Sequence, residues 1–348
     1  MRILLIFLLF TISINAQWNQ KGLDIDGAAA DDRSGRAVSI SSDGNIVAIG
    51  ASLNDNSGID AGHVRIFEWN GSTWTQKGLD INGEYAGDYS GCSVSLSNNG
   101  NIIAIGAQFN SSDKGHVRIY EWSGTNWLQK GTDIIGEGYN DRSGYCVSID
   151  STGSIVAIGA PGNGDAGTLA GHVRVYEWGS NDWIQKGSDL DGEAGSDFSG
   201  KSVSINSNGN IVAIGAEYND GAGASSGHVR VYEWGGNDWV QKGLDIDGEA
   251  VNDYSGCAVS VCSDGNTIAI GAYSNDGIGN ASGHVRVYEW SGTNWIQKGL
   301  DIDGEAPSDN FGKSVSINSA GNRVAIGGPA NNGNGSGAGN VRVYEWSG

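Results

Sequence analysis

The feature that most constrains this chain of 348 residues is a sequence unit that recurs six times. Its most regular phrase, W-x-Q-K-G, begins at residues 18, 74, 127, 183, 239 and 295. A chain of this length normally divides into several cores, but repeated units pack only on their neighbours and can continue as one array. The sequence therefore predicts a single repeat domain over residues 17–348.

Each unit contains four short strand patterns separated by turn residues. In the second unit these are residues 74–81, 92–97, 101–107 and 116–122. The pattern at 101–107 is apolar on both faces, whereas 92–97 alternates with serines, whose small side chains allow close approach near an axis. Four antiparallel strands in a repeat of this length are typical of a propeller blade. We expect an all-β, six-bladed β-propeller with four-stranded antiparallel blades.

The two ends of the sequence suggest how such a ring would close. The first W-x-Q-K-G phrase lies at residue 18, and the last unit stops at residues 346–348, where another such strand would follow. We expect the N-terminal strand to pair with residues 340–346. This pairing would remove two open sheet edges.

The first 16 residues predict export. One basic residue, Arg2, precedes an apolar run from Ile3 to Ile12 and the small residue Ala16, the pattern of a signal peptide. The run is too short to span a membrane, so we expect a secreted, extracellular monomer without membrane insertion. The net charge of −20 disfavours nucleic acid as a partner. The cysteine spacing indicates no disulfide framework.

Several short motifs match one known family. Phe311-Gly312 opens a serine-alternating strand, Gly159-Ala160-Pro161 follows an apolar strand, and residues 171–176 read G-x-V-x-V-Y. In these motifs the repeats resemble the FG-GAP units of integrin-α-like propellers. The resemblance implies ligand binding or adhesion. The family has seven blades, however, and its D-x-D-x-D-G calcium loop has no counterpart in the short hairpin at residues 42–45.

If the serine-rich strand is innermost, the two long loops of each unit emerge on one face. These loops contain 29 of the 40 acidic residues, so we expect an acidic, loop-rich face. Carboxylates there could bind calcium, with Asp245, Asp247, Glu249 and Asp253 as candidate ligands. There are two alternatives to calcium binding. The acidic rim could simply be solvated, or the Asp before each Ser-Gly could cap its own turn.

The second long loop differs most among the units, and binding sites concentrate on such loops. Aromatic, amide and carboxylate groups there could bind a glycan or protein ligand, although partly buried loop anchors would give the same pattern. The candidate ligand-binding residues are Phe109, Asn110, Tyr218, Asn219, Asp220, Tyr273, Asn275 and Asp276.

The five histidines each begin the same strand after a glycine. Because symmetry places them on separate blades, they are too far apart to share one metal ion unless they line the axis, and we expect structural hydrogen bonding instead. The sequence thus predicts a secreted or cell-surface, non-enzymatic recognition or adhesion propeller. A structural extracellular protein is the alternative. A hydrolase is disfavoured because every candidate catalytic group is a repeated scaffold residue.

Overall fold

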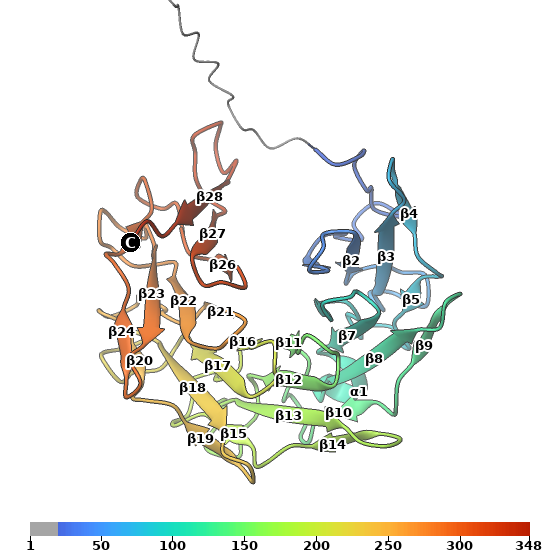
Figure 1. The fold of residues 1–348 in the computed structure, drawn as a ribbon, viewed down its shortest axis with the longest axis horizontal. Coiled ribbons are helices and arrows are strands. Elements are labelled where there is room, and N and C mark those ends of the chain that lie inside the picture. Colours follow the sequence, from blue (N-terminus) through green and yellow to red (C-terminus); the bar gives the residue numbers. More distant parts are fainter. Residues whose placement is uncertain (1–19) are drawn as a thin grey trace, which may run out of the picture.

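Six antiparallel sheets are arranged around a common centre in the computed structural model, which describes residues 20–348 (Figure 1). The predicted all-β, six-bladed propeller is confirmed. Residues 1–16, assigned above to a signal peptide, and the first tryptophan of the repeat lie outside the described residues.

The first blade shows the plan of the next four. It contains β1 (Ala37–Ile40), β2 (Ile46–Ala51), β3 (His63–Trp69), β4 (Trp74–Gln76) and β5 (Ile81–Asn82). Both β4 and β5 pair with β3, so the predicted fourth strand is interrupted into two short pieces. Because the W-x-Q-K-G phrase forms this outer strand, each of these five blades takes strands from two consecutive sequence units.

The remaining strands repeat this order. The second blade has β6 (Ser93–Leu96), β7 (Ile102–Ala107), β8 (His116–Trp122), β9 (Trp127–Gln129) and β10 (Ile134–Ile135), with the single turn α1 (Asn110–Asp113) in its loop. The third has β11 (Cys146–Ile149), β12 (Ile155–Ala160), β13 (His172–Trp178), β14 (Trp183–Gln185) and β15 (Leu190–Asp191). The fourth has β16 (Ser202–Ile205), β17 (Ile211–Ala216), β18 (His228–Trp234), β19 (Trp239–Gln241) and β20 (Ile246–Asp247). The fifth has β21 (Ala258–Val261), β22 (Thr267–Ala272), β23 (His284–Trp290), β24 (Trp295–Gln297) and β25 (Ile302–Asp303), and the sixth has β26 (Ser314–Ile317), β27 (Arg323–Gly328) and β28 (Asn340–Glu345).

The second strand of a blade is apolar on both faces because it contributes to two cores. All six residues of β7 are buried. Ile103 and Ile105 pack in a core with strands of the first blade, whereas Ile102 and Ala104 pack in a core with strands of the third. Successive side chains of a strand point to opposite faces, so a sheet between two others needs apolar residues at every position.

The inner strands are joined across neighbouring blades by their serines. The hydroxyl oxygen of Ser39 accepts the backbone N–H of Leu96 at 3.0 Å, and that of Ser95 accepts the N–H of Ile149 at 3.1 Å. The same contact recurs at the next three junctions. These serines therefore do more than allow close approach, since each one also bonds the following blade.

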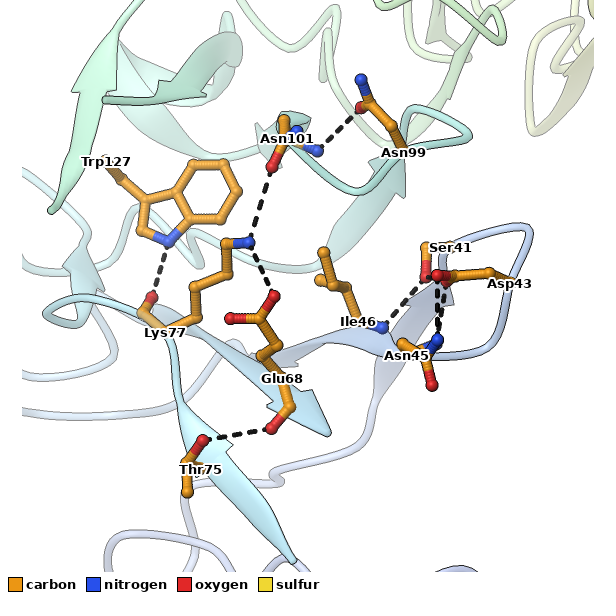
Figure 2. Close-up of polar contacts among 10 residues, drawn as sticks. All are labelled: Ser41, Asp43, Asn45, Ile46, Glu68, Thr75, Lys77, Asn99, Asn101 and Trp127. Atoms are coloured by element: carbon orange, nitrogen blue, oxygen red, sulfur yellow. Dashed lines mark hydrogen bonds and ion pairs between the residues drawn. The ribbon is translucent and has the colours of Figure 1, made fainter. Parts of the chain in front are cut away.

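The outer strands are joined by a tryptophan and a lysine (Figure 2). Lys77 follows β4 of the first blade, and its backbone carbonyl accepts the indole N–H of Trp127, in the second blade, at 2.8 Å. Its ammonium group lies 3.4 Å from Glu68 and 3.5 Å from the Asn101 side-chain oxygen. The fourth strand thus belongs to one sheet but contacts the next.

The short hairpin between β1 and β2 illustrates the turns at the opposite end of each blade (Figure 2). Asp43 accepts hydrogen bonds from the hydroxyl of Ser41 and the side-chain amide of Asn45, at 2.6 and 2.9 Å. These bonds lower the pKa of Asp43 to about 2. We call this end of the propeller, formed by the short hairpins, the tight-turn face.

The expected pairing of the N-terminal strand with residues 340–346 falls partly on residues outside the described ones, and the described residues contain no such pair. In the described part of the chain β28 pairs only with β27, and the ring is open between β28 and the first blade (Figure 1). Residues 21–26 contact the first blade, where Trp74 and Arg65 donate to the carbonyls of Lys21 and Asp26. Trp127 and Arg118 donate in the same way to Lys77 and Asn82 at the next junction. The contacts that recur between neighbouring blades determine the angle between them. The strand pattern of the sequence does not show whether the sum of these angles closes the ring.

Deletion of residues 17–27 should therefore act through the first blade. We expect a loss of about 1–3 kcal/mol in the free energy of unfolding, because four hydrogen bonds to the first blade and the cover over Trp74 are removed. Chemical denaturation of the chain with and without residues 17–27 would measure it. Equal stabilities would show that this segment contributes nothing to the first blade.

Candidate functional site

The long loops lie on one face, and the first long loop of each unit is hydrogen-bonded to the second long loop of the preceding unit. The loop that follows β5 donates from Gly83 to the carbonyl of Gly62 at 2.7 Å and from Ser90 to that of Ala61 at 2.9 Å. Equivalent bonds recur in the next blades. The predicted loop-rich face therefore exists, opposite the tight-turn face.

One buried aspartate per unit holds these loops in shape. Asp88 accepts backbone N–H groups from Glu84 and Tyr85 at 3.2 and 2.9 Å. Its equivalents are also buried: Asp32, Asp141, Asp197, Asp253 and Asp309. The interpretation that this Asp caps its own turn is correct, and these six acids are not available to an external ligand.

Two variable positions flank the Ser-Gly pair that precedes each inner strand, which is Phe311-Gly312 in the sixth unit. The first holds Arg33, Tyr89, Arg142, Phe198, Tyr254 and Asn310, and the second holds Arg36, Cys92, Tyr145, Lys201, Cys257 and Lys313. All residues at the first position have positive φ, between 52° and 57°. Since the inner strands surround the centre of the ring, these side chains lie around the centre of the loop-rich face.

Six aromatic side chains gather at this centre. We call Tyr89, Phe109, Phe198, Tyr218, Tyr254 and Tyr273 the central aromatic cluster. Ring centroids are 5.2 Å apart for Phe198 and Tyr218, 5.2 Å for Tyr218 and Tyr254, and 5.3 Å for Tyr254 and Tyr273. Tyr89 and Phe109 form a separate pair at 4.9 Å. All six side chains are partly exposed.

Cationic side chains lie on these rings. The ammonium groups of Lys201 and Lys313 are 4.8 and 3.5 Å from the ring centroids of Tyr218 and Tyr273, and Arg142 lies over Phe109. Lys201 also bonds the buried carboxylate of Glu217. Burial acts to lower the pKa of Lys201, but the bond to Glu217 outweighs burial and raises it. The face is thus acidic at its rim and basic and aromatic at its centre.

A depression of about 280 Å³ opens beside this cluster. It is lined by Arg142, Tyr145, Phe198 and Lys201, together with Leu169 and residues of two loops. Burial raises the pKa of Tyr145, so its hydroxyl is neutral at neutral pH and can donate a hydrogen bond. The depression offers an apolar wall and three polar groups to one small ligand unit.

The predicted ligand-binding residues divide into two groups. The rings of Phe109, Tyr218 and Tyr273 belong to the central aromatic cluster. The amides do not join them, because Asn110, Asn219 and Asn275 are buried. Asn219 donates to Asp197 and Asn275 to Asp253, both at 2.9 Å. Asp220 and Asp276 are exposed, and each accepts a backbone N–H of its own loop at 2.7 Å.

The predicted calcium ligands are not gathered in one site. Asp245 lies beside Glu193 and His228, whereas Glu249 lies beside His284 and Asp301 at the next junction. Asp253 is buried and bonds Ala250 and Asn275. Burial raises the pKa of Asp247, with the charge of Asp245 as the second cause. The set proposed from the sequence is therefore split between different sites.

The residues that the sequence reasoning missed are Tyr89, Tyr145, Phe198, Tyr254, Lys201 and Lys313. Each occupies a single variable position of a D-x-S-G-x phrase, which reads D-x-F-G-x in the sixth unit. Variation among the six units at those two positions was the sequence signal for these residues. It concerns single positions rather than a whole variable loop.

The fold and this face define the class of the molecule as a six-bladed propeller with one loop-rich surface. No family model matches the sequence, and no curated protein matches it. Among solved structures, hydrazine synthase of Kuenenia stuttgartiensis is similar with a TM-score of 0.59 at 12% identity, over 89% of this chain and 83% of that one.

A 6-phosphogluconolactonase candidate from Bacteroides uniformis is similar with a TM-score of 0.61 at 11% identity, over 89% of this chain and 80% of that one. At such identities the similarity concerns the fold alone. No helix among residues 20–348 is long and apolar enough to cross a membrane.

Proposed function

We propose that this protein is a secreted, non-enzymatic recognition propeller of the FG-GAP type that binds an extracellular glycan at the centre of its loop-rich face. The observation that carries the proposal is the central aromatic cluster with its basic neighbours. Partly exposed aromatic rings offer apolar faces on which sugar rings can stack, and their polar edges remain hydrated. Adhesion to a surface that carries such a glycan would follow from this binding.

The basic side chains narrow the ligand to an acidic glycan. Four cationic side chains lie around the centre of the loop-rich face, although the net charge of the whole chain is −20: Arg36, Arg142, Lys201 and Lys313. Guanidinium and ammonium groups form charge-assisted hydrogen bonds with carboxylate or sulfate groups. A neutral polysaccharide would use the rings but not these cations.

Backbone conformation supports a role beyond packing. Phe198 and Tyr254 have φ of 54° and 55°, a region that is uncommon for bulky side chains and easier for glycine or asparagine. Asn310 occupies the equivalent position of the sixth unit. Residues held in such conformations cluster at ligand sites.

Binding to a panel of neutral and acidic polysaccharides tests the proposal. We expect selective binding of acidic polymers and at least a tenfold loss of affinity in Tyr218→Ala and Lys201→Ala. Tyr254→Asn, which suits the local φ, should keep or raise the melting temperature while it weakens binding.

The matched control is Asn208→Ala, an exposed position on the tight-turn face. It should bind like the parent protein. Normal binding by all three central variants, or loss of binding in the Asn208 variant, would contradict the proposed site.

A further inference from the structure

Four equivalent clusters of one histidine and two carboxylates lie at successive junctions between blades. In each, the histidine begins the third strand of a blade, the aspartate precedes the last short strand of the same blade, and the glutamate lies in the loop arriving from the previous blade. The clusters are Glu84, His116 and Asp133; Glu137, His172 and Asp189; Glu193, His228 and Asp245; and Glu249, His284 and Asp301. The three ligand atoms of each lie within 4.8 Å of one another.

The separations are too long for direct hydrogen bonds. The Nδ1 atom of His116 lies 3.6 Å from Asp133 Oδ2 and 3.9 Å from Glu84 Oε2. At the fourth cluster, His284 Nδ1 lies 3.7 Å from Asp301 Oδ2 and 3.9 Å from Glu249 Oε2. An ion bonded at about 2.0–2.2 Å to a nitrogen and an oxygen holds these atoms roughly 3.3–3.6 Å apart, so small shifts would suffice.

The carboxylates are oriented by contacts behind them. The side-chain amide of Gln129 donates to Asp133 Oδ1 at 2.6 Å, so the other oxygen faces the imidazole. Likewise Arg118 lies 3.8 Å from Glu84 Oε1, while Oε2 faces His116. The same division of oxygens recurs at the fourth cluster, through Gln297 and Arg286. Contacts of this kind fix the ligands of metal sites.

The imidazoles supply an independent observation. His172 has a side chain that is 1% exposed, and neither of its ring nitrogens has a hydrogen-bond partner. A buried polar atom without a partner is costly, and its Nδ1 points at Asp189 and Asp191, at 3.8 and 3.9 Å.

We propose that each cluster binds one divalent first-row transition-metal ion, with zinc as the representative, through histidine Nδ1, aspartate Oδ2 and glutamate Oε2. An imidazole ligand favours such ions over calcium, which prefers a larger all-oxygen shell. The glutamates are 37–45% exposed, which leaves the outer side of the ion open to water. Each ion would tie the loop from one blade to the next blade.

The chain contains its own incomplete versions of the site. His63 lies 3.7 Å from Asp80, but Ala28 stands where the other junctions have glutamate. In the sixth blade Asn340 replaces the histidine and lies 3.5 Å from Glu305. These two positions indicate substitutions that the fold already accommodates.

Zinc titration of chelator-treated protein, with bound metal counted by elemental analysis after desalting, tests the proposal. We expect four zinc ions per chain, and three in both His172→Asn and Glu137→Ala. The second variant alters an exposed carboxylate, so it addresses binding even if loss of the buried imidazole impairs folding. Zinc should remain bound in millimolar calcium.

The matched control is His63→Asn, a buried histidine at a junction without the glutamate, which should still bind four ions. An unchanged count in both His172→Asn and Glu137→Ala would assign the bound zinc elsewhere, for example to the four free cysteines, and would overturn the proposal. Absence of bound zinc in the parent protein would do the same.

Discussion

Alanine in place of Gly159 is expected to destabilise the protein by about 3 kcal/mol or more, because the new methyl group would overlap the backbone of the neighbouring blade. Gly159 lies in β12 at the junction of the third and fourth blades. A Cβ atom there would lie 2.0 Å from the carbonyl oxygen of Gly200 and 2.9 Å from its carbonyl carbon. Both are backbone atoms, so no side-chain rotation can relieve the contact, and the two blades must separate.

Gly164→Ala is the control for this substitution. Gly164 lies in the following loop, where the nearest atom to a new Cβ is 4.0 Å away, and its φ is compatible with alanine. We expect a change of less than about 1 kcal/mol, in the stabilising direction, because alanine restricts the unfolded chain. Urea denaturation of both variants would measure the difference. Similar stabilities would mean that the blades can move apart at little cost.

Asp197→Ala should reduce both stability and ligand binding. The buried carboxylate accepts the backbone N–H of Ala194 at 3.1 Å and the side-chain amide of Asn219 at 2.9 Å. Its loss leaves the buried Asn219 amide without a partner, at a cost of about 2–3 kcal/mol. Phe198 and Tyr218 are next to these two residues, so the central aromatic cluster should loosen as well.

Asp220→Ala provides the comparison for that variant. Asp220 is exposed and accepts one backbone N–H, from Ser225, within its own loop. We expect a loss of less than about 1 kcal/mol and nearly normal glycan binding. Thermal unfolding together with the polysaccharide assay would distinguish the two variants. A larger effect for Asp220 than for Asp197 would show that the exposed carboxylate, not the buried one, organises the face.

Predictions made within one repeat were reliable because they depend on local patterning. The doubly apolar run at 101–107 correctly indicated a strand covered on both faces, and the serines of 92–97 correctly indicated the inner strand. The loop-rich face followed from the order of loops and turns along the unit. The aspartate caps followed from the turn chemistry of Asp before Ser-Gly.

Predictions that combined different repeats were less reliable. The histidines were considered only as ligands shared with one another, whereas the structure brings each one beside an aspartate and a glutamate. His116 and Glu84 come from different blades, and no spacing within a unit indicates their distance. Likewise Asn219 has the residue type of a ligand-binding group but lies beneath its loop, bonded to Asp197.

The sequence by itself determined the number of repeats, the strand pattern, the two unlike faces and the acidic rim, because strand period and turn residues act over a few neighbouring positions. Only the tertiary structure decided how the blades are spaced and that the ring remains open in the described residues. It also decided which side chains meet at the centre and at the junctions. Those arrangements depend on the angle between blades, which arises from packing summed over the whole ring, as at Gly159 and Gly200.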